Sequence, residues 1–196
     1  MTLRATTAAA LTLTGLLVFT GCAAGSGGTM PGMDHSAPTA TPTATGATAA
    51  DAMFASMMIA HHRQAVEMSD SVLAKDGVDP RVAALAQRIK AAQSPEIAQL
   101  QGWLDDWGVA AGSGTGMDHG SGMMTEEDLA RLEAATGAEA SRLFLEQMIV
   151  HHEGAIAMAE TQIADGDNAE AVALAREIVA AQGEEITEMR ELLAAL

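Results

Sequence analysis

The chain has 196 residues, of which 26 are acidic and 10 are basic, and its formal net charge is −16. Aromatic residues make up only 3% and Tyr is absent, which favours helices packed through small and aliphatic side chains over a β-sandwich. The acidic charge argues against nucleic acid or an anionic membrane surface as a partner. The single cysteine excludes an intramolecular disulfide framework and any Cys-rich zinc or iron–sulfur site.

Residues 1–22 have the pattern of a bacterial signal peptide. A basic start at Arg4 is followed by a short apolar run that is too short and too rich in Thr to span a membrane stably. The run ends in Thr20-Gly21-Cys22, which resembles a lipoprotein processing site in which Cys22 becomes the lipidated first residue. We therefore expect an extracytoplasmic protein anchored to the bacterial cell membrane through Cys22. The alternative is a secretory signal that is cut nearby without lipidation.

Residues 23–50 are rich in Gly, Ser, Thr, Pro and Ala and predict a disordered tether, because they have too few large apolar side chains to offset the entropy of ordering. A second Gly-rich stretch, residues 108–124, predicts a linker. The sequence Gly-Met-Asp-His occurs in both segments, at 32–35 and at 116–119. Methionine in a solvated segment has no core to fill, so we expect these segments to offer auxiliary ligands for a soft metal. The candidates are Met33, His35, Met117, His119, Met123 and Met124.

The remaining sequence consists of two similar repeats, residues 51–107 and 125–196. The segment 54–68 aligns with 144–158 at an offset of 90, and both carry the same Phe, Met, Ile, His-His, Ala and Met positions. Further on, at an offset of 89, Gln93 and Glu96 correspond to Gln182 and Glu185. The one-residue gap falls in a turn, so each repeat predicts an αα-hairpin.

The pattern predicts helices at 51–75, 79–107, 126–135, 138–165 and 168–195. Asp79-Pro80 supplies a helix start, and Thr125 with Asp128 forms a near capping box for the short helix. Two hairpins with apolar stripes bury them best against each other, so we expect an all-α fold, an antiparallel four-helix bundle with one short extra helix. Pro95 and Gly183 lie at nearly equivalent positions and predict a bend.

The paired histidines lie beside the inward face of their helices when residues are placed at 100° intervals. The twofold relation of the repeats is expected to bring up to four imidazoles and four thioethers toward a shared interior. The candidate ligands are Met58, His61, His62, Met68, Met148, His151, His152 and Met158. This soft donor set suits Cu(I), with Ag(I) or Cu(II) as alternatives. The absence of Glu-x-x-His disfavours a di-iron site.

A buried imidazole without a partner costs about 1–3 kcal/mol, so the rings are expected to have ligands or polar neighbours. On the same helix faces the candidate polar partners are Gln64, Glu67, Glu153 and Glu160. Packing remains the alternative role for Met57, Met58 and Met148, and a structural polar layer remains the alternative role for the histidines. The acidic side chains, including those at 126–128 and 184–185, are most simply a solvated face.

The segment 144–159, with the pattern Phe-Leu-x-x-Met-Ile-x-His-His-x-Gly-Ala-Ile-x-Met-Ala, resembles the signature of the domain-of-unknown-function 305 family. The resemblance covers about residues 51–196. It implies a ferritin-like four-helix bundle that is secreted or lipid-anchored in bacteria. Some members bind copper in the periplasm through Met and His, which implicates the eight candidate ligands. The first repeat departs from the pattern at Arg63, Gln64 and Glu67, which puts the shape of its site in question.

Three functions follow as hypotheses. The first is a lipid-anchored protein that buffers, sequesters or hands on Cu(I) without turnover, with a copper-handling partner that the sequence does not identify. The second is a non-catalytic helical scaffold or interaction module whose histidine pairs are structural. The third is a metal-dependent redox enzyme, which the shortage of carboxylate ligands and the absence of Tyr disfavour.

Overall fold

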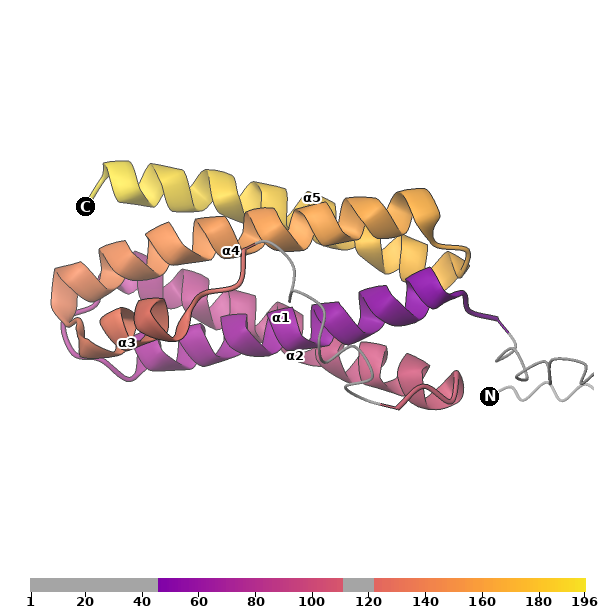
Figure 1. The fold of residues 1–196 in the computed structure, drawn as a ribbon. Coiled ribbons are helices and arrows are strands. Elements are labelled where there is room, and N and C mark those ends of the chain that lie inside the picture. Colours follow the sequence, from indigo (N-terminus) through magenta and orange to yellow (C-terminus); the bar gives the residue numbers. More distant parts are fainter. Residues whose placement is uncertain (1–45, 111–121) are drawn as a thin grey trace, which may run out of the picture. The chain divides into compact units, whose positions relative to one another are not determined.

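The computed structural model describes residues 46–110 and 122–196, and this part of the chain is helical without strands. Its helices are α1 (Ala49–Leu73), α2 (Pro80–Asp106), α3 (Glu126–Ala134), α4 (Gly137–Asp165) and α5 (Ala169–Ala194). Helices α1 and α2 form one hairpin, α4 and α5 form the other, and α1 packs against α4 (Figure 1). The predicted four-helix bundle with one short extra helix is confirmed. The expected signal peptide and most of the expected tether lie outside the described residues.

The helix ends follow from local capping. Helix α1 begins two residues before the predicted start because Thr48 and Asp51 form a capping box, in which each side chain bonds the other residue's backbone N–H. Thr125 and Asp128 form the same box at the start of α3, as predicted. Asp79 caps α2 with Pro80 in its first turn. Helix α2 continues through Pro95 without ending there.

Buried polar side chains fix each hairpin turn to the other hairpin. At one end, the Asp51 carboxylate accepts hydrogen bonds from the Gln162 side chain at 2.6 Å and from the backbone N–H of Asn168 at 3.2 Å. At the other end, the equivalent position of the second repeat is Ser141, whose hydroxyl oxygen accepts from the backbone N–H of Asp79 at 3.0 Å. The two repeats therefore lock each other in register at both ends.

The core consists of two apolar clusters separated along the bundle by a polar layer. The α3-end cluster includes Met68, Val72, Val82, Leu85, Ile89, Leu132, Phe144, Met148 and Met189. The opposite-end cluster includes Phe54, Met58, Leu100, Leu104, Ala155, Leu174 and Ile178. Between the two clusters in all four long helices lie the residues that we call the central layer: His61, His62, Gln93, Gln182, His151 and His152.

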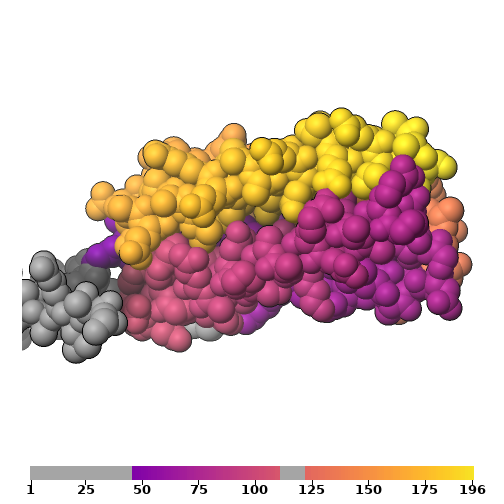
Figure 2. Space-filling model, turned by 180° about the vertical axis from the view of Figure 1, so that it is seen from behind, coloured from indigo at the N-terminus to yellow at the C-terminus, as the bar shows by residue number. Residues whose placement is uncertain are grey.

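Helices α2 and α5 run side by side on the back of the bundle and cover that face (Figure 2). A salt bridge between the Arg88 guanidinium on α2 and the Glu188 carboxylate on α5 crosses from one hairpin to the other. Because both side chains are exposed, this pair adds about 1 kcal/mol or less to stability. Within the described residues, no helix is both long enough and apolar enough to cross a membrane.

Candidate metal centre

His61 and His151 meet at the middle of the bundle. They lie on α1 and α4 at equivalent positions of the repeat, and their ring centroids are 3.7 Å apart with an angle of 43° between the ring planes. Both side chains are at most 1% exposed. None of their four ring nitrogens makes a hydrogen bond of good geometry, although the backbone of His61 is a polar neighbour of the His151 ring. Since buried polar atoms in proteins are nearly always paired, this contact between two unpartnered imidazoles requires an explanation.

The rings of this pair are neutral at ordinary pH. Burial lowers the pKa of His61 to about 3, and the neighbouring His62 and His152 lower it further in the same direction. Burial also holds the pKa of His151 well below its usual value, and the other histidines of the layer add to the effect. A neutral imidazole keeps one nitrogen lone pair, so each ring can act as a metal ligand without first losing a proton.

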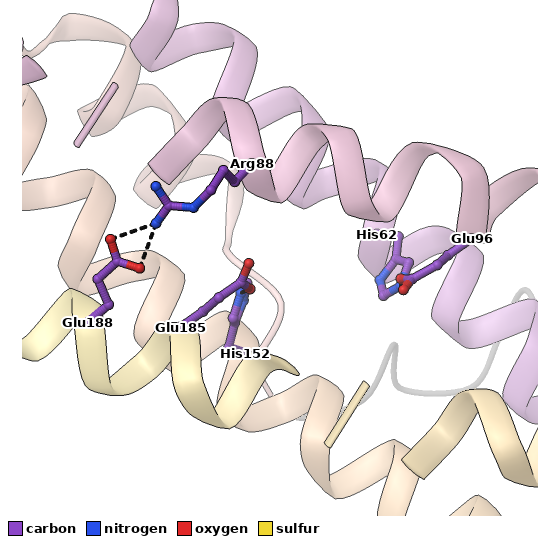
Figure 3. Close-up of polar contacts among 6 residues, drawn as sticks. All are labelled: His62, Arg88, Glu96, His152, Glu185 and Glu188. Carbon is purple, nitrogen blue, oxygen red and sulfur yellow. Dashed lines mark hydrogen bonds and ion pairs between the residues drawn. The ribbon is translucent and has the colours of Figure 1, made fainter. Parts of the chain in front are cut away.

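The other two histidines are each held by a carboxylate from the second helix of their own hairpin. His62 Nε2 lies 2.6 Å from Glu96 Oε2, and His152 Nε2 lies 2.7 Å from Glu185 Oε2. Figure 3 shows the first pair between α1 and α2 and the second between α4 and α5. Because a carboxylate oxygen accepts, Nε2 donates this hydrogen bond, so a neutral ring keeps its lone pair on Nδ1, and both Nδ1 atoms are buried without a partner. This is the arrangement by which carboxylates orient metal-binding histidines.

These contacts correct the partners that were expected for the rings. Gln64 instead bonds the backbone of Met124, and Glu153 pairs with Arg190. Glu185 was expected on a solvated face, but it is four-fifths covered and binds His152. Helical periodicity identifies neighbours on one helix only, whereas the partners come from the antiparallel register of each hairpin. The signal that could have found them was the repeat itself, because Glu96 and Glu185 occupy equivalent positions.

The four candidate methionines do not converge on one point. Met58 lies one turn before His61 in the opposite-end cluster, and Met148 lies one turn before His151 in the α3-end cluster. Met68 and Met158 lie seven residues beyond their histidines, about 10 Å along the axis at 1.5 Å per residue, and in opposite directions. The eight candidate side chains are therefore spread along the bundle and not gathered at one point. The structure brings together His61 and His151, with Met58 and Met148 the nearest thioethers in sequence.

The end of the linker crosses the seam between α1 and α4 beside this pair. Gly122, at a φ of 101°, packs so closely on α4 that a Cβ there would lie 2.8 Å from Gly154 Cα. Met124 exchanges backbone hydrogen bonds with the Gln64 amide on α1, at 2.7 and 3.0 Å. Met124 also packs against the α3-end cluster, so the expectation that it has no core to fill is wrong. Met123 lies half-buried in the same crossing.

Met33, His35, Met117, His119 and Cys22 lie outside the described residues.

The donor set of the central layer is dominated by imidazole. Across 46–110 and 122–196, no group of three or more His, Cys, Asp and Glu side chains is close enough to hold a metal ion. Six ring nitrogens of the layer are buried without a hydrogen-bond partner. The side-chain carbonyl oxygens of Gln93 and Gln182 are also buried and without partners. Sequence reasoning missed these two residues, although they too are equivalent in the repeats. Two imidazoles with nearby thioethers suit a soft ion that accepts few ligands, and they do not suit a hard ion that requires an oxygen cage.

Both the sequence and the fold of the chain match known proteins. Residues 51–193 match the family described as Domain of unknown function (DUF305). A DUF305 fragment from Deinococcus radiodurans is 32% identical, with a TM-score of 0.71 over 77% of this chain and 99% of that one. A DUF305 protein from Streptomyces coelicolor is 35% identical, with a TM-score of 0.68 over 74% of this chain and 93% of that one.

A third similar structure is CopM in its Cu(I)-bound form, 28% identical, with a TM-score of 0.62 over 74% of this chain and 96% of that one. CopM structures in Cu(II)-bound and Ag-bound forms are similar to this chain as well. No protein in the curated set matches the chain. The family match extends over most of the sequence and the whole bundle, and the chain belongs to the DUF305 family.

Proposed function

We propose that the protein binds a soft monovalent metal ion, Cu(I) foremost and Ag(I) by the same chemistry, at the contact between His61 and His151. The single observation that carries this proposal is the pair of buried, neutral imidazoles, none of whose four nitrogens makes a hydrogen bond of good geometry. Each unpaired buried polar group costs about 1–3 kcal/mol, and a bound ion offsets that cost. The binding of copper and silver by the similar protein CopM supports the choice of metal.

The rest of the central layer supports the same site. Glu96 and Glu185 hold His62 and His152, and the Nδ1 atom of each ring is buried without a partner, so the layer has two further nitrogen donors outside the His61–His151 contact. Met58 and Met148 lie one turn before His61 and His151 on the same helices and are the nearest thioethers in sequence. Thioether and imidazole ligands select Cu(I) over the hard divalent ions, and Cu(II) is a weaker fit because it prefers a tetragonal set of nitrogen and oxygen ligands.

The protein's role follows from its location and from the burial of the site. Residues 1–22 predict export with lipidation at Cys22, and the DUF305 relative from Streptomyces coelicolor is named as a candidate secreted protein. A fully enclosed ion is poorly placed to react with a substrate. We therefore propose that the protein buffers or sequesters Cu(I) outside the cytoplasm and hands it on, without catalysing a reaction.

Titration of the full chain with Cu(I) against a competing chelator tests the metal proposal. In the His61→Leu/His151→Leu variant we expect the affinity to fall at least 100-fold, because leucine fills the space but donates no lone pair. The matched control is Met189→Leu, a volume-conserving change at a buried thioether outside the central layer, and it should bind as the unaltered protein does. Unchanged binding in the histidine variant would move the site to the tether and linker. No binding by the unaltered protein would leave a helical scaffold with a structural polar layer.

The anchor has a separate test. Cys22→Ser should move the protein from the membrane fraction to the soluble extracytoplasmic fraction of expressing bacteria. A membrane-bound Cys22→Ser protein would contradict lipidation at this residue.

A further inference from the structure

A groove lies on the α1–α4 face at the end of the bundle opposite α3. It has a volume of about 390 Å³, and its walls are predominantly apolar. Three of its lining side chains are methionines: Met53 and Met57 on α1, and Met158 on α4. Positions i and i+4 lie above one another on a helix, so the two α1 thioethers share one face, and Met158 lines the groove from the facing helix.

Two of the three methionines, Met53 and Met57, are not packed in either core cluster, whereas Met158 contacts the opposite-end cluster on one side and lines the groove on the other. Met53 is 43% exposed, and Met57 and Met158 are each only half-buried. Fully buried methionines such as Met68 and Met189 fill gaps between packed helices, whereas Met53 has solvent on one side. A cluster of thioethers at an open surface gains little from burial, so its chemistry as a set of soft ligands becomes the better explanation.

A polar atom in the wall of the groove also lacks a partner. Gln162, which is 2% exposed, lines the groove and donates its amide N–H to Asp51 at 2.6 Å. That bond fixes the orientation of the amide and leaves its carbonyl oxygen, Oε1, buried without a hydrogen bond. The Asp165 carboxylate is an additional lining group and contributes negative charge. The groove therefore combines three soft sulfurs with a charge that attracts cations, and one of its lining side chains, Gln162, has a buried oxygen without a partner.

The equivalent surface of the other repeat has no such set. The residues that correspond to Met53 and Met57 are Leu143 and Gln147, and both are buried. The thioether groove is therefore a feature of one end of the bundle and does not follow from the duplication.

We propose that this groove is a second soft-metal site, in which Met53, Met57 and Met158 bind a Cu(I) or Ag(I) ion from solution. The proposal deepens the proposed function, and it rests on that function for the identity of the metal. Met53, Met57 and His61 follow one another at intervals of four residues on α1, from exposed through half-buried to fully buried. The groove is the outer of the two sites, one helical turn from the imidazole pair at its nearest residue. Met158, one of the eight candidate ligands, belongs to this outer site.

Silver nitrate titrated into the full chain, labelled with ¹³C in the methionine methyl groups, tests the site residue by residue. Single Met→Leu variants assign each methyl resonance with little change in volume. We expect the Met53, Met57 and Met158 resonances to shift together on binding, and the Met189 resonance to stay in place. The same three shifts should persist in the His61→Leu/His151→Leu variant, which lacks the inner pair. Met158→Leu should weaken the groove shifts at least tenfold in Ag(I) concentration, whereas Met189→Leu should not.

Two failures are distinguishable in this experiment. If Ag(I) moves the ring resonances of His61 and His151 and leaves the three groove methyl groups unchanged, the groove is overturned and the inner site stands. If the groove methyl groups move and the rings do not, the groove is a metal site and the proposed inner centre fails.

Discussion

Met68 and Met158 occupy equivalent positions in the two repeats but have different surroundings. Met68 is fully buried in the α3-end cluster, which also contains Leu132 of α3. Met158 is half-buried and lines the groove at the end that α3 does not cover. One duplicated residue therefore has a structural role where an extra helix covers it and is accessible to solvent where none does. The insertion between the hairpins, and not the repeat, sets this difference.

The two ends share their connection to the central layer. Along α1, His61 and His62 follow the residues of the groove end. Along α4, His151 and His152 follow the residues of the α3 end. Both pairs are buried. Near-twofold symmetry thus holds at the middle of the bundle and is lost toward its ends. The two repeats therefore have the same residues in the central layer and different surroundings at the ends of the bundle.

The largest expected effect is the loss in the free energy of unfolding when each of these two methionines is changed to alanine. Met68→Ala should lower the free energy of unfolding by about 2–5 kcal/mol, because it leaves a cavity in a fully packed cluster. Met158→Ala should cost about 1 kcal/mol or less, because its surroundings are open to solvent. Urea unfolding monitored by circular dichroism measures both. Equal losses would show that α3 does not make the ends different.

Acid should destabilise the protein through the central layer, which lies between the two ends of the bundle. Well above pH 6.5 His61 and His151 are neutral in the folded and unfolded states, and their protonation in the unfolded chain sets in near that value. Because the folded pKa of His61 is about 3 and that of His151 is also lowered, the unfolded state binds more protons between pH 6.5 and 3. The metal-free protein should therefore lose a few kcal/mol of stability as pH falls through this window.

The same unfolding measured at pH 7, 5.5 and 4 checks this expectation. His61→Leu/His151→Leu should show a shallower loss, because those two groups no longer titrate. Equal slopes for the variant and the unaltered protein would mean that carboxylates elsewhere account for the acid sensitivity.

The matched His–Glu pairs test how symmetric the layer is. Glu96→Gln and Glu185→Gln each keep the shape of the side chain but remove the charge that orients a ring. Each change should weaken Cu(I) binding about tenfold, which corresponds to about 1.4 kcal/mol. Chelator competition measures the affinity, and Glu188→Gln, an exposed change on α5 away from the rings, is the control. A large effect from one variant alone would show that the two halves bind unequally.

The smallest expected effect concerns the contact that holds α3 in place. Gln147 Nε2 donates to the backbone carbonyl of Asp128 in α3 at 2.8 Å, at the position that in the first repeat is Met57. Gln147→Ala should cost about 1 kcal/mol of stability, and it should increase hydrogen exchange in α3 more than in α5. Uniform exchange in both helices would contradict an anchoring role for this bond.

Much of the fold and part of the candidate site could be predicted from the sequence. Periodicity, the caps at Asp79 and Thr125, and the internal repeat identified the helices, the two hairpins and the inward placement of the histidines. These features depend on residues a few positions apart, whose geometry a helix determines by itself. The repeat also indicated that equivalent histidines such as His61 and His151 would approach each other, because equivalent residues meet across a twofold axis.

Only the tertiary structure decided which residues those histidines contact. The bonds to Glu96 and Glu185 depend on the antiparallel register within each hairpin, and the position of the linker end depends on the close fit of Gly122 against Gly154. The different environments of Met68 and Met158 depend on where α3 packs. Such contacts join residues that are distant in sequence, and the packing of whole helices sets their distances, which no local pattern specifies.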